Sequence, residues 1–256
     1  MTMAIPPQLN PDPNVDIDTN NSDRVIPNSQ KKDVTQEKSY WASFYSKFTL
    51  AIPSQFCVLT ATEVKSDQPI VEFGCGNGRD SIYLASQGFI VHACDLSKEA
   101  IEHNQAKTTT STSTSTSTNT SHCAIEFAAV DATNREQVET IINQARTQGR
   151  SGNVTIYSRF FLHSIDEAQE DLFLDALSAA LVHGDEIRSE YRSKEDEALA
   201  KVHGKGHYRR YIDTPALVQK LKHKGFETVY EITGRGMAKY KNEDPFVSRI
   251  TTVKKN

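Results

Sequence analysis

The chain has 256 residues, with 29 Lys or Arg, 33 Asp or Glu and a formal net charge of −4 at pH 7. This length can bury the core of one catalytic domain, and the acidic balance disfavours a nucleic-acid partner, which requires an excess of cations. The four cysteines are widely separated, without C-x-x-C metal spacing or the density of a disulfide scaffold, so we expect a reducing, cytoplasmic compartment, with Cys75 and Cys94 as buried packing residues. We also expect metal independence; the alternative is a site of carboxylates from distant loops, which leaves no spacing in the sequence.

The first 36 residues are rich in Pro, Asn and Asp and have no apolar run long enough for a signal peptide or a spanning helix. We predict a disordered tail there, no membrane partner, and one folded domain over residues 37–256. Residues 37–66 begin this domain with two predicted helices, one at 40–48 with many aromatic residues and one at 53–63. These helices could cover a ligand or an edge of a sheet.

A glycine-rich turn follows the first predicted strand. The apolar run at residues 70–73 leads directly into Gly74, Gly76 and Gly78. Glycine allows positive φ and has no Cβ, so such a turn can bring its backbone close to a ligand while the next helix offers free amides. Dinucleotide-binding turns usually have G-x-G-x-x-G spacing, and the G-x-G-x-G spacing here therefore favours a different cofactor.

Polar residues also follow the next three predicted strands. Asp95 ends the strand at 89–95, Asp131 follows the strand at 124–130, and the strand at 154–157 leads into residues 158–163. In an open α/β sheet, ligands bind beyond the carboxyl ends of the strands, so these residues should converge. Either acid taken alone could instead cap a helix or stabilise a turn.

In this series of motifs, the chain resembles the class I S-adenosylmethionine-dependent methyltransferases over roughly residues 41–254. The resemblance implies an α/β fold with a Rossmann-like seven-stranded, mostly parallel sheet, helices on both faces and an antiparallel C-terminal strand. It places Glu72 and the glycines along the methionine part of the cofactor, Asp95 on the ribose and Asp131 near the adenine amine. The remaining candidates for cofactor contact are Leu96, Ala132 and Tyr157.

The other predicted elements fit this fold. We expect helices at 98–107, 135–147, 167–181 and 214–224, a fifth strand at 185–191 and a closing β pair at 227–233 and 246–253, with Asn134 and Asp166 as helix caps. Residues 108–121 are almost entirely Thr and Ser. Such a segment has almost no apolar surface to bury, so we predict a flexible loop.

Methyl transfer from a sulfonium is an in-line displacement, so the acceptor must be held against the methyl group and can require a base to remove its proton. The candidates for this base are His163, Glu190, His207 and Tyr211. In the resembling family, a His at position 163 is often a structural hydrogen-bonding residue.

Cations near the fourth and fifth strands suggest an acidic acceptor, because guanidinium groups pair well with carboxylate or phosphate. The candidates for acceptor contact are Arg159, Arg188, Arg192, Arg209, Arg210 and Tyr45. The alternative for each arginine is a salt bridge with a nearby acidic side chain.

The predicted function is transfer of a methyl group from S-adenosylmethionine to a small, acidic molecule or to a saccharide. The alternatives are a non-catalytic cofactor-binding partner subunit and a nucleotide-dependent oxidoreductase on a similar sheet.

Overall fold

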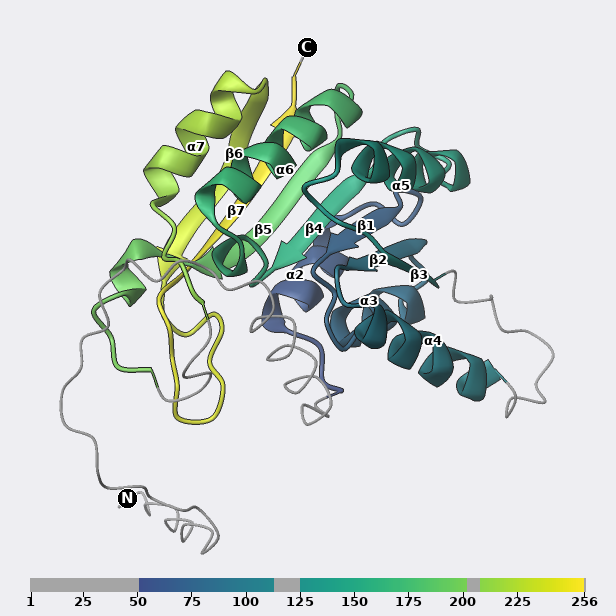
Figure 1. The fold of residues 1–256 in the computed structure, drawn as a ribbon, viewed down its shortest axis with the longest axis horizontal. Helices are drawn as coiled ribbons and strands as arrows, with labels where there is room; N and C mark the ends of the chain where they lie inside the picture. The colour runs from purple at the N-terminus through teal and green to yellow at the C-terminus, as the bar shows by residue number, and fades with distance from the viewer. Residues whose placement is uncertain (1–50, 113–124, 202–207, 256) are drawn as a thin grey trace, which may run out of the picture. The chain divides into compact units, whose positions relative to one another are not determined.

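A seven-stranded sheet organises residues 51–112, 125–201 and 208–255, the part of the chain that this computed structural model describes (Figure 1). Its strands follow the spatial order β3-β2-β1-β4-β5-β7-β6. The strands are β1 (Ile70–Phe73), β2 (Val91–Asp95), β3 (Ile125–Ala129), β4 (Thr155–Arg159), β5 (Glu186–Arg192), β6 (Phe226–Gly234) and β7 (Val247–Lys254).

Strands β1 to β5 pair in parallel, whereas β7 is antiparallel to both of its neighbours, β5 and β6. The carboxyl ends of the five parallel strands therefore meet at one edge of the sheet, which we call the carboxyl edge. The fold predicted from the sequence, with its antiparallel C-terminal strand, is confirmed.

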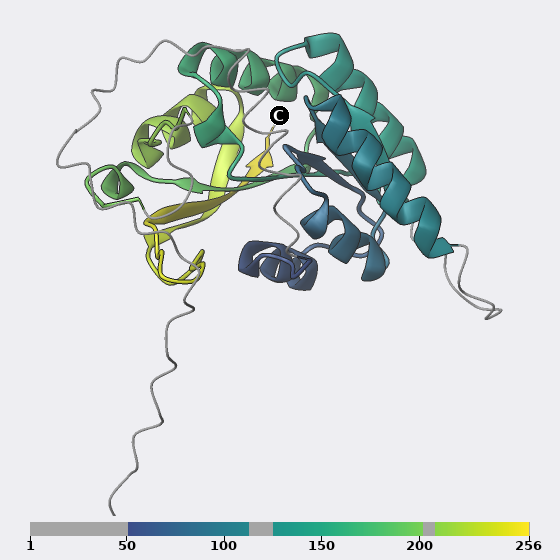
Figure 2. The ribbon, with the colours of Figure 1, turned by 60° about the horizontal axis from the view of Figure 1, so that its bottom comes forward.

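Two groups of helices cover the two faces of the sheet. The helices are α2 (Gln55–Glu63), α3 (Arg79–Ser86), α4 (Lys98–Thr112), α5 (Arg135–Gln148), α6 (Glu167–Ala180) and α7 (Thr214–His223). Helices α5, α6 and α7 pack around one apolar core, while α2, α3 and α4 contribute to a second core on the opposite face. Figure 2 shows α2 and α3 separated from α5, α6 and α7 by the sheet.

Helix caps explain where several of these elements begin. As predicted, the Asn134 side chain accepts a hydrogen bond from the Gln137 amide at 3.1 Å and caps α5. Asp166 forms a reciprocal capping box with Gln169 at the start of α6. Two short 3₁₀ turns, η1 (Leu162–Ser164) and η2 (Lys194–Asp196), follow β4 and β5 at the carboxyl edge.

The predicted start of the Thr/Ser loop at residue 108 is wrong, because α4 continues to Thr112. The Thr108 hydroxyl donates to the backbone carbonyls of Asn104 and Gln105, so it bonds within the helix rather than competing with it. The rest of the predicted loop, the tail at 1–36 and the helix at 40–48 lie outside the described residues.

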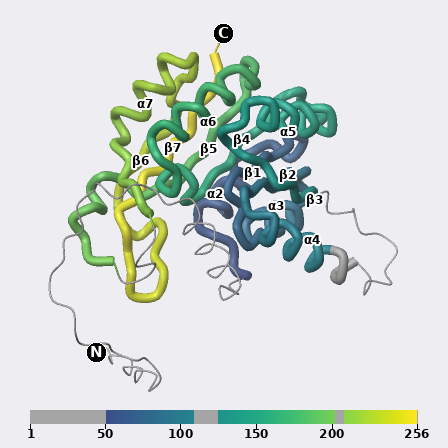
Figure 3. Tube along the Cα trace, in the orientation of Figure 1, coloured from purple at the N-terminus to yellow at the C-terminus, as the bar shows by residue number. Residues whose placement is uncertain are grey.

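The hairpin between β6 and β7 lies at the carboxyl edge of the sheet, since β7 begins opposite the end of β5. Figure 3 traces this hairpin, residues 235–246, beyond the end of β6. Backbone hydrogen bonds between Tyr240 and Glu243 close its tip. The buried Glu243 of this hairpin contacts Arg192 at the end of β5, so the hairpin is fixed to the carboxyl edge.

Candidate functional site

The glycine turn after β1 folds against the end of β2. The amides of Gly74 and Cys75 both donate to the Cys94 carbonyl, at 2.8 and 2.9 Å. Gly74 has φ of +75°, and a Cβ there would lie 2.9 Å from the Phe161 ring. A larger residue at position 74 would therefore be strained and would collide with the loop after β4.

Asp95 connects this turn to the end of β2. One of its carboxylate oxygens accepts the Gly76 amide and the other accepts the Ser97 amide, both at 2.9 Å. Burial raises the pKa of Asp95, while the backbone hydrogen bonds oppose that rise. Each carboxylate oxygen has two lone pairs, so both oxygens can accept a further bond from a vicinal diol. The adjacent Leu96 side chain is 53% exposed and offers an apolar surface beside this carboxylate.

Asp131 lies at the next strand end, beside Asp95. The Val130 amide donates to the Asp95 carbonyl at 3.0 Å, which holds the two strand ends together. The Asp131 carboxylate accepts the amide and the hydroxyl of Thr133, at 2.8 and 2.7 Å. Asp131 thus also stabilises a turn, as the alternative interpretation of this acid requires, and the adjacent Ala132 packs against the core.

Ser54 and Asp80, which had no predicted role, form a buried polar cluster beneath the glycine turn with the predicted cofactor residues Glu72 and Tyr157. Glu72, on β1, accepts a hydrogen bond from the Ser81 hydroxyl and is 3% exposed. Asp80 accepts hydrogen bonds from Ser54 and from the Tyr157 hydroxyl. Tyr157, a predicted cofactor contact, is fully buried and stacks on Phe56 of α2, with 5.2 Å between ring centroids. The sequence signal was the Pro53-Ser54 pair before α2, which is typical of a helix N-cap.

Arg159 and Glu190 form a buried ion triad with Arg249. The Nε atoms of Arg159 and Arg249 donate to separate oxygens of Glu190, at 2.8 and 2.7 Å. Glu190 is 1% exposed, so the structure places this predicted base between two guanidinium groups. Arg249 had no sequence signal, because its partner is 59 residues away in the chain.

Phe160, also missed by the sequence analysis, lies beside this triad in an unusual backbone conformation. Its φ of +57° is rare for a bulky residue, and such strain is concentrated at functional sites. The guanidinium carbon of Arg159 lies 4.1 Å from the centre of its ring, and that of Arg192 lies 5.8 Å from it. Both distances are typical of cation–π contacts.

The other candidate arginines fall into two groups. Arg192 pairs with Asp196 at 2.6 Å and with Glu243, at the carboxyl edge. Arg209 lies close enough for the Arg192 charge to lower its pKa, although burial is the larger cause. In contrast, Arg188 pairs with Glu63 and Glu186 in the body of the sheet.

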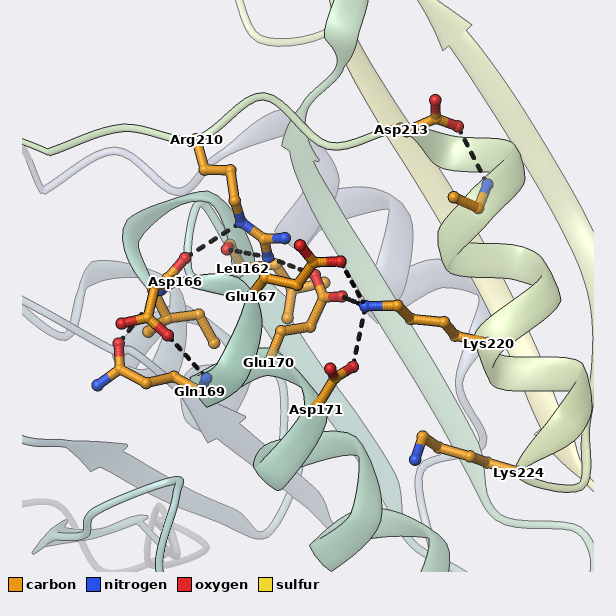
Figure 4. Close-up of polar contacts among 12 residues, drawn as sticks. Leu162, Asp166, Glu167, Gln169, Glu170, Asp171, Arg210, Asp213, Lys220 and Lys224 are labelled. Carbon is orange, nitrogen blue, oxygen red and sulfur yellow. Dashed lines mark hydrogen bonds and ion pairs between the residues drawn. The ribbon is translucent and has the colours of Figure 1, made fainter. Parts of the chain in front are cut away.

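Arg210 serves mainly to connect segments of the chain. Its guanidinium contacts Glu170 on α6, and Glu170 also accepts a hydrogen bond from Lys220 on α7 at 3.1 Å (Figure 4). The same guanidinium donates to the carbonyls of Leu162 and Ile165. These contacts tie the segment before α7 to η1 and to the start of α6.

The predicted bases occupy different environments. His163 is 3% exposed, and its Nδ1 accepts a hydrogen bond from the Arg192 amide at 3.2 Å, which agrees with the structural alternative for this residue. Tyr211 is half-buried, with the Lys201 ammonium 5.0 Å from its ring centre. His207 and Tyr45 lie outside the described residues.

The described residues fit the cofactor that the resemblance implies. A glycine turn at positive φ, a carboxylate able to accept a diol and an exposed apolar side chain meet at the carboxyl edge. Among the described side chains, no group of three or more His, Cys, Asp or Glu could hold a metal ion. The helices that the structure describes are too short or too polar to cross a membrane.

Solved structures share this fold. The chain matches a SAM-dependent methyltransferase from Anabaena variabilis ATCC 29413 with a TM-score of 0.64 and 18% identity, over 88% of this chain and 96% of the other. A SAM-dependent methyltransferase from Methanosarcina mazei matches with a TM-score of 0.56 and 17% identity, over 77% and 96%. The glycopeptide N-methyltransferase MtfA, complexed with S-adenosylmethionine, matches with a TM-score of 0.56 and 12% identity, over 80% and 95%. No curated protein matches the chain.

The sheet order, the glycine turn and the acids at the strand ends give the chain the fold of the class I S-adenosylmethionine-dependent methyltransferases, the family that the sequence resembles. Residues 34–146, less than half of the chain, match the family model described as tellurite resistance protein TehB. That match includes the glycine turn, Asp95 and Asp131, and the cofactor of the class is S-adenosylmethionine.

Proposed function

We propose that this protein is an S-adenosylmethionine-dependent methyltransferase that acts on a small acidic molecule or an acidic saccharide. The observation that carries the proposal is an excess of buried and half-buried cations at the ends of β4 and β5. Among the residues that the structure describes, five cationic side chains gather there with three carboxylates: Arg159, Arg192, Lys201, Arg209 and Arg249 with Glu190, Asp196 and Glu243. A bound anion would relieve the repulsion between Arg192 and Arg209.

The roles proposed for the cofactor-site residues follow from their contacts. The backbone of the glycine turn would lie along the methionine part, Asp95 would accept the ribose diol, and Leu96 and Asp131 would flank the adenine. S-adenosylmethionine supplies a methyl group on a positively charged sulfur. The protein's own contribution is to hold the acceptor in line with that group and to exclude water.

The acceptor proton requires a separate explanation. Because the Nδ1 of His163 accepts the Arg192 amide, a neutral ring carries its proton on Nε2 and cannot take another at Nδ1 without losing that bond. Both oxygens of Glu190 already accept guanidinium donors. Tyr211 and His207 stay as predicted bases, and an acceptor that is already ionised at its reacting atom would need none.

Thermal shift measurements test the cofactor part of this proposal. A ligand that binds only the folded state increases the free energy of unfolding, by about 2.7 kcal/mol at a concentration of a hundred times its Kd, and therefore raises the melting temperature. We expect stabilisation by S-adenosylmethionine and S-adenosylhomocysteine, its loss in Asp95→Ala, and no effect of NAD(H). Stabilisation by NAD(H) alone would support the oxidoreductase alternative instead.

A methyl-transfer assay tests the acceptor part. A panel of small carboxylic and phosphorylated compounds, each paired with its neutral ester or amide, should yield transfer to acidic members only. Equal transfer to both members of each pair would refute an acidic acceptor. Cofactor binding without transfer to any acceptor would favour the non-catalytic partner subunit.

A further inference from the structure

Asp80 is a buried carboxylate to which the proposed function gives no role. It is in the first turn of α3, directly after the glycine turn, and is 4% exposed. Its oxygens accept the amide and the hydroxyl of Ser54, both at 2.7 Å, and the Tyr157 hydroxyl at 2.9 Å. Asp80 therefore joins the start of α2, the start of α3 and strand β4, although its partners are 26 and 77 residues away in the chain.

A second buried carboxylate, Glu72, belongs to the same cluster. Glu72 and Tyr157 are register partners on β1 and β4, and Ser81, the residue after Asp80, donates to Glu72. Arg79 contacts Asp80 at 3.7 Å. Two carboxylates that share a buried site cannot both ionise easily. Among the described residues, Asp80 accepts hydrogen bonds from three donors and contacts a guanidinium, whereas Glu72 accepts from one hydroxyl, so the geometry favours the proton on Glu72.

We propose that Asp80 is a positioning residue of the cofactor site, which holds Ser54 and Tyr157 against the glycine turn and keeps a proton on Glu72. This inference rests on the cofactor binding of the proposed function. When the ammonium group of the cofactor's methionine part binds near Glu72, the carboxyl group releases its proton to solvent and becomes a carboxylate. No other bond is made or broken in this step.

The charges around Glu72 agree with this assignment. Burial, and next the Asp80 charge, raise the pKa of Glu72 to about 8, while the Ser81 hydrogen bond and Arg79 lower it and Asp95 raises it. The titratable groups that interact with Glu72 from the packed elements are Cys57 on α2, Cys75 in the glycine turn, Cys94 and Asp95 on β2, Tyr157 on β4, and Arg79 and Asp80 on α3.

The protonation of Glu72 determines how the affinity for the cofactor changes with pH. Below a pKa of about 8, Glu72 in the ligand-free protein is mostly protonated, and a cationic ligand favours its ionised form. Affinity should therefore rise with pH and level off above this pKa. If binding releases exactly one proton, the affinity should rise by at most about fiftyfold between pH 6 and pH 8.

Titration calorimetry with S-adenosylhomocysteine between pH 6 and 8.5, in buffers of contrasting ionisation enthalpy, tests this inference. The wild-type protein should release a proton near pH 7. Glu72→Gln should bind without this pH dependence. In Asp80→Asn, which keeps the shape of the side chain, the rise in affinity should move to lower pH because the neighbouring negative charge is gone.

Ser54→Ala is the matched control. It removes a donor to Asp80 but no charge, so it should weaken binding without moving the pH dependence. The inference would be overturned if wild type and Asp80→Asn had the same pH dependence of binding, or if Glu72→Gln kept that dependence. If Asp80→Asn does not fold, the Glu72→Gln variant still tests the inference. Absence of binding at every pH would instead refute the proposed function.

Discussion

Replacing Glu190 by Gln distinguishes a structural role of this residue, at the centre of the ion triad, from a role as catalytic base. The substitution keeps the size of the side chain but leaves two guanidinium groups, Arg159 and Arg249, around a neutral amide. Glu190 is 1% exposed and accepts from them at 2.8 and 2.7 Å. Breaking a buried ion pair from one side costs about 3–5 kcal/mol. At about 2–4 °C per kcal/mol for a domain of this size, the melting temperature should fall by about 6–20 °C.

Urea unfolding measures this loss directly. The urea concentration at the midpoint of unfolding should fall. The slope of the free energy of unfolding against urea concentration should stay the same, because the surface exposed on unfolding is the same. Glu139→Gln is the matched control, since Glu139 forms an exposed pair with Arg135 at 2.6 Å, and its loss should cost about 0.5 kcal/mol or less. If Glu190→Gln stays within about 1 kcal/mol of wild type but loses methyl transfer, Glu190 is a base and our explanation of the triad is refuted.

Two further predictions concern the same edge of the sheet. At Phe160, with φ of +57°, Asn tolerates the left-handed backbone better than a β-branched residue, so Phe160→Val should lose about 1–3 kcal/mol more stability than Phe160→Asn. Equal melting temperatures of the two variants would contradict this. Arg209→Ala should raise the KM for an acidic acceptor about tenfold or more, as expected for loss of a charge-assisted hydrogen bond. Arg150→Ala, at an exposed position near the opposite edge of the sheet, should leave this KM unchanged, and equal effects of the two substitutions would argue against a role of Arg209 in acceptor binding.

The parts of the fold that depend on short-range signals could be predicted from the sequence. The caps Asn134 and Asp166 bond to amides three residues away, and the glycine turn needs its backbone conformation whatever packs around it. The fifth strand was predicted at 185–191 and is observed at Glu186–Arg192. Such small differences arise because the register with neighbouring strands sets the ends of a strand.

The partners of the buried charges could not be predicted in the same way. Which cation faces Glu190, and which donors face Asp80, depends on strands and helices brought together from 26 to 77 residues apart. The sequence pattern indicates the type of residue at the carboxyl edge, but only the folded chain shows that most of the candidate arginines already have carboxylate partners.

The position of β7 has a consequence for how the protein folds. Although β7 follows β6 in the sequence, it lies between β5 and β6, and its pairing with β5 joins Glu186 to Val253. Strand β6 therefore has no place in the sheet until β7 is present. Contacts this distant in sequence close slowly, because the entropy of the intervening chain is lost before they form. The half of the sheet that carries Glu190 and Arg249 should therefore be the last to assemble, after the strands that form the cofactor site.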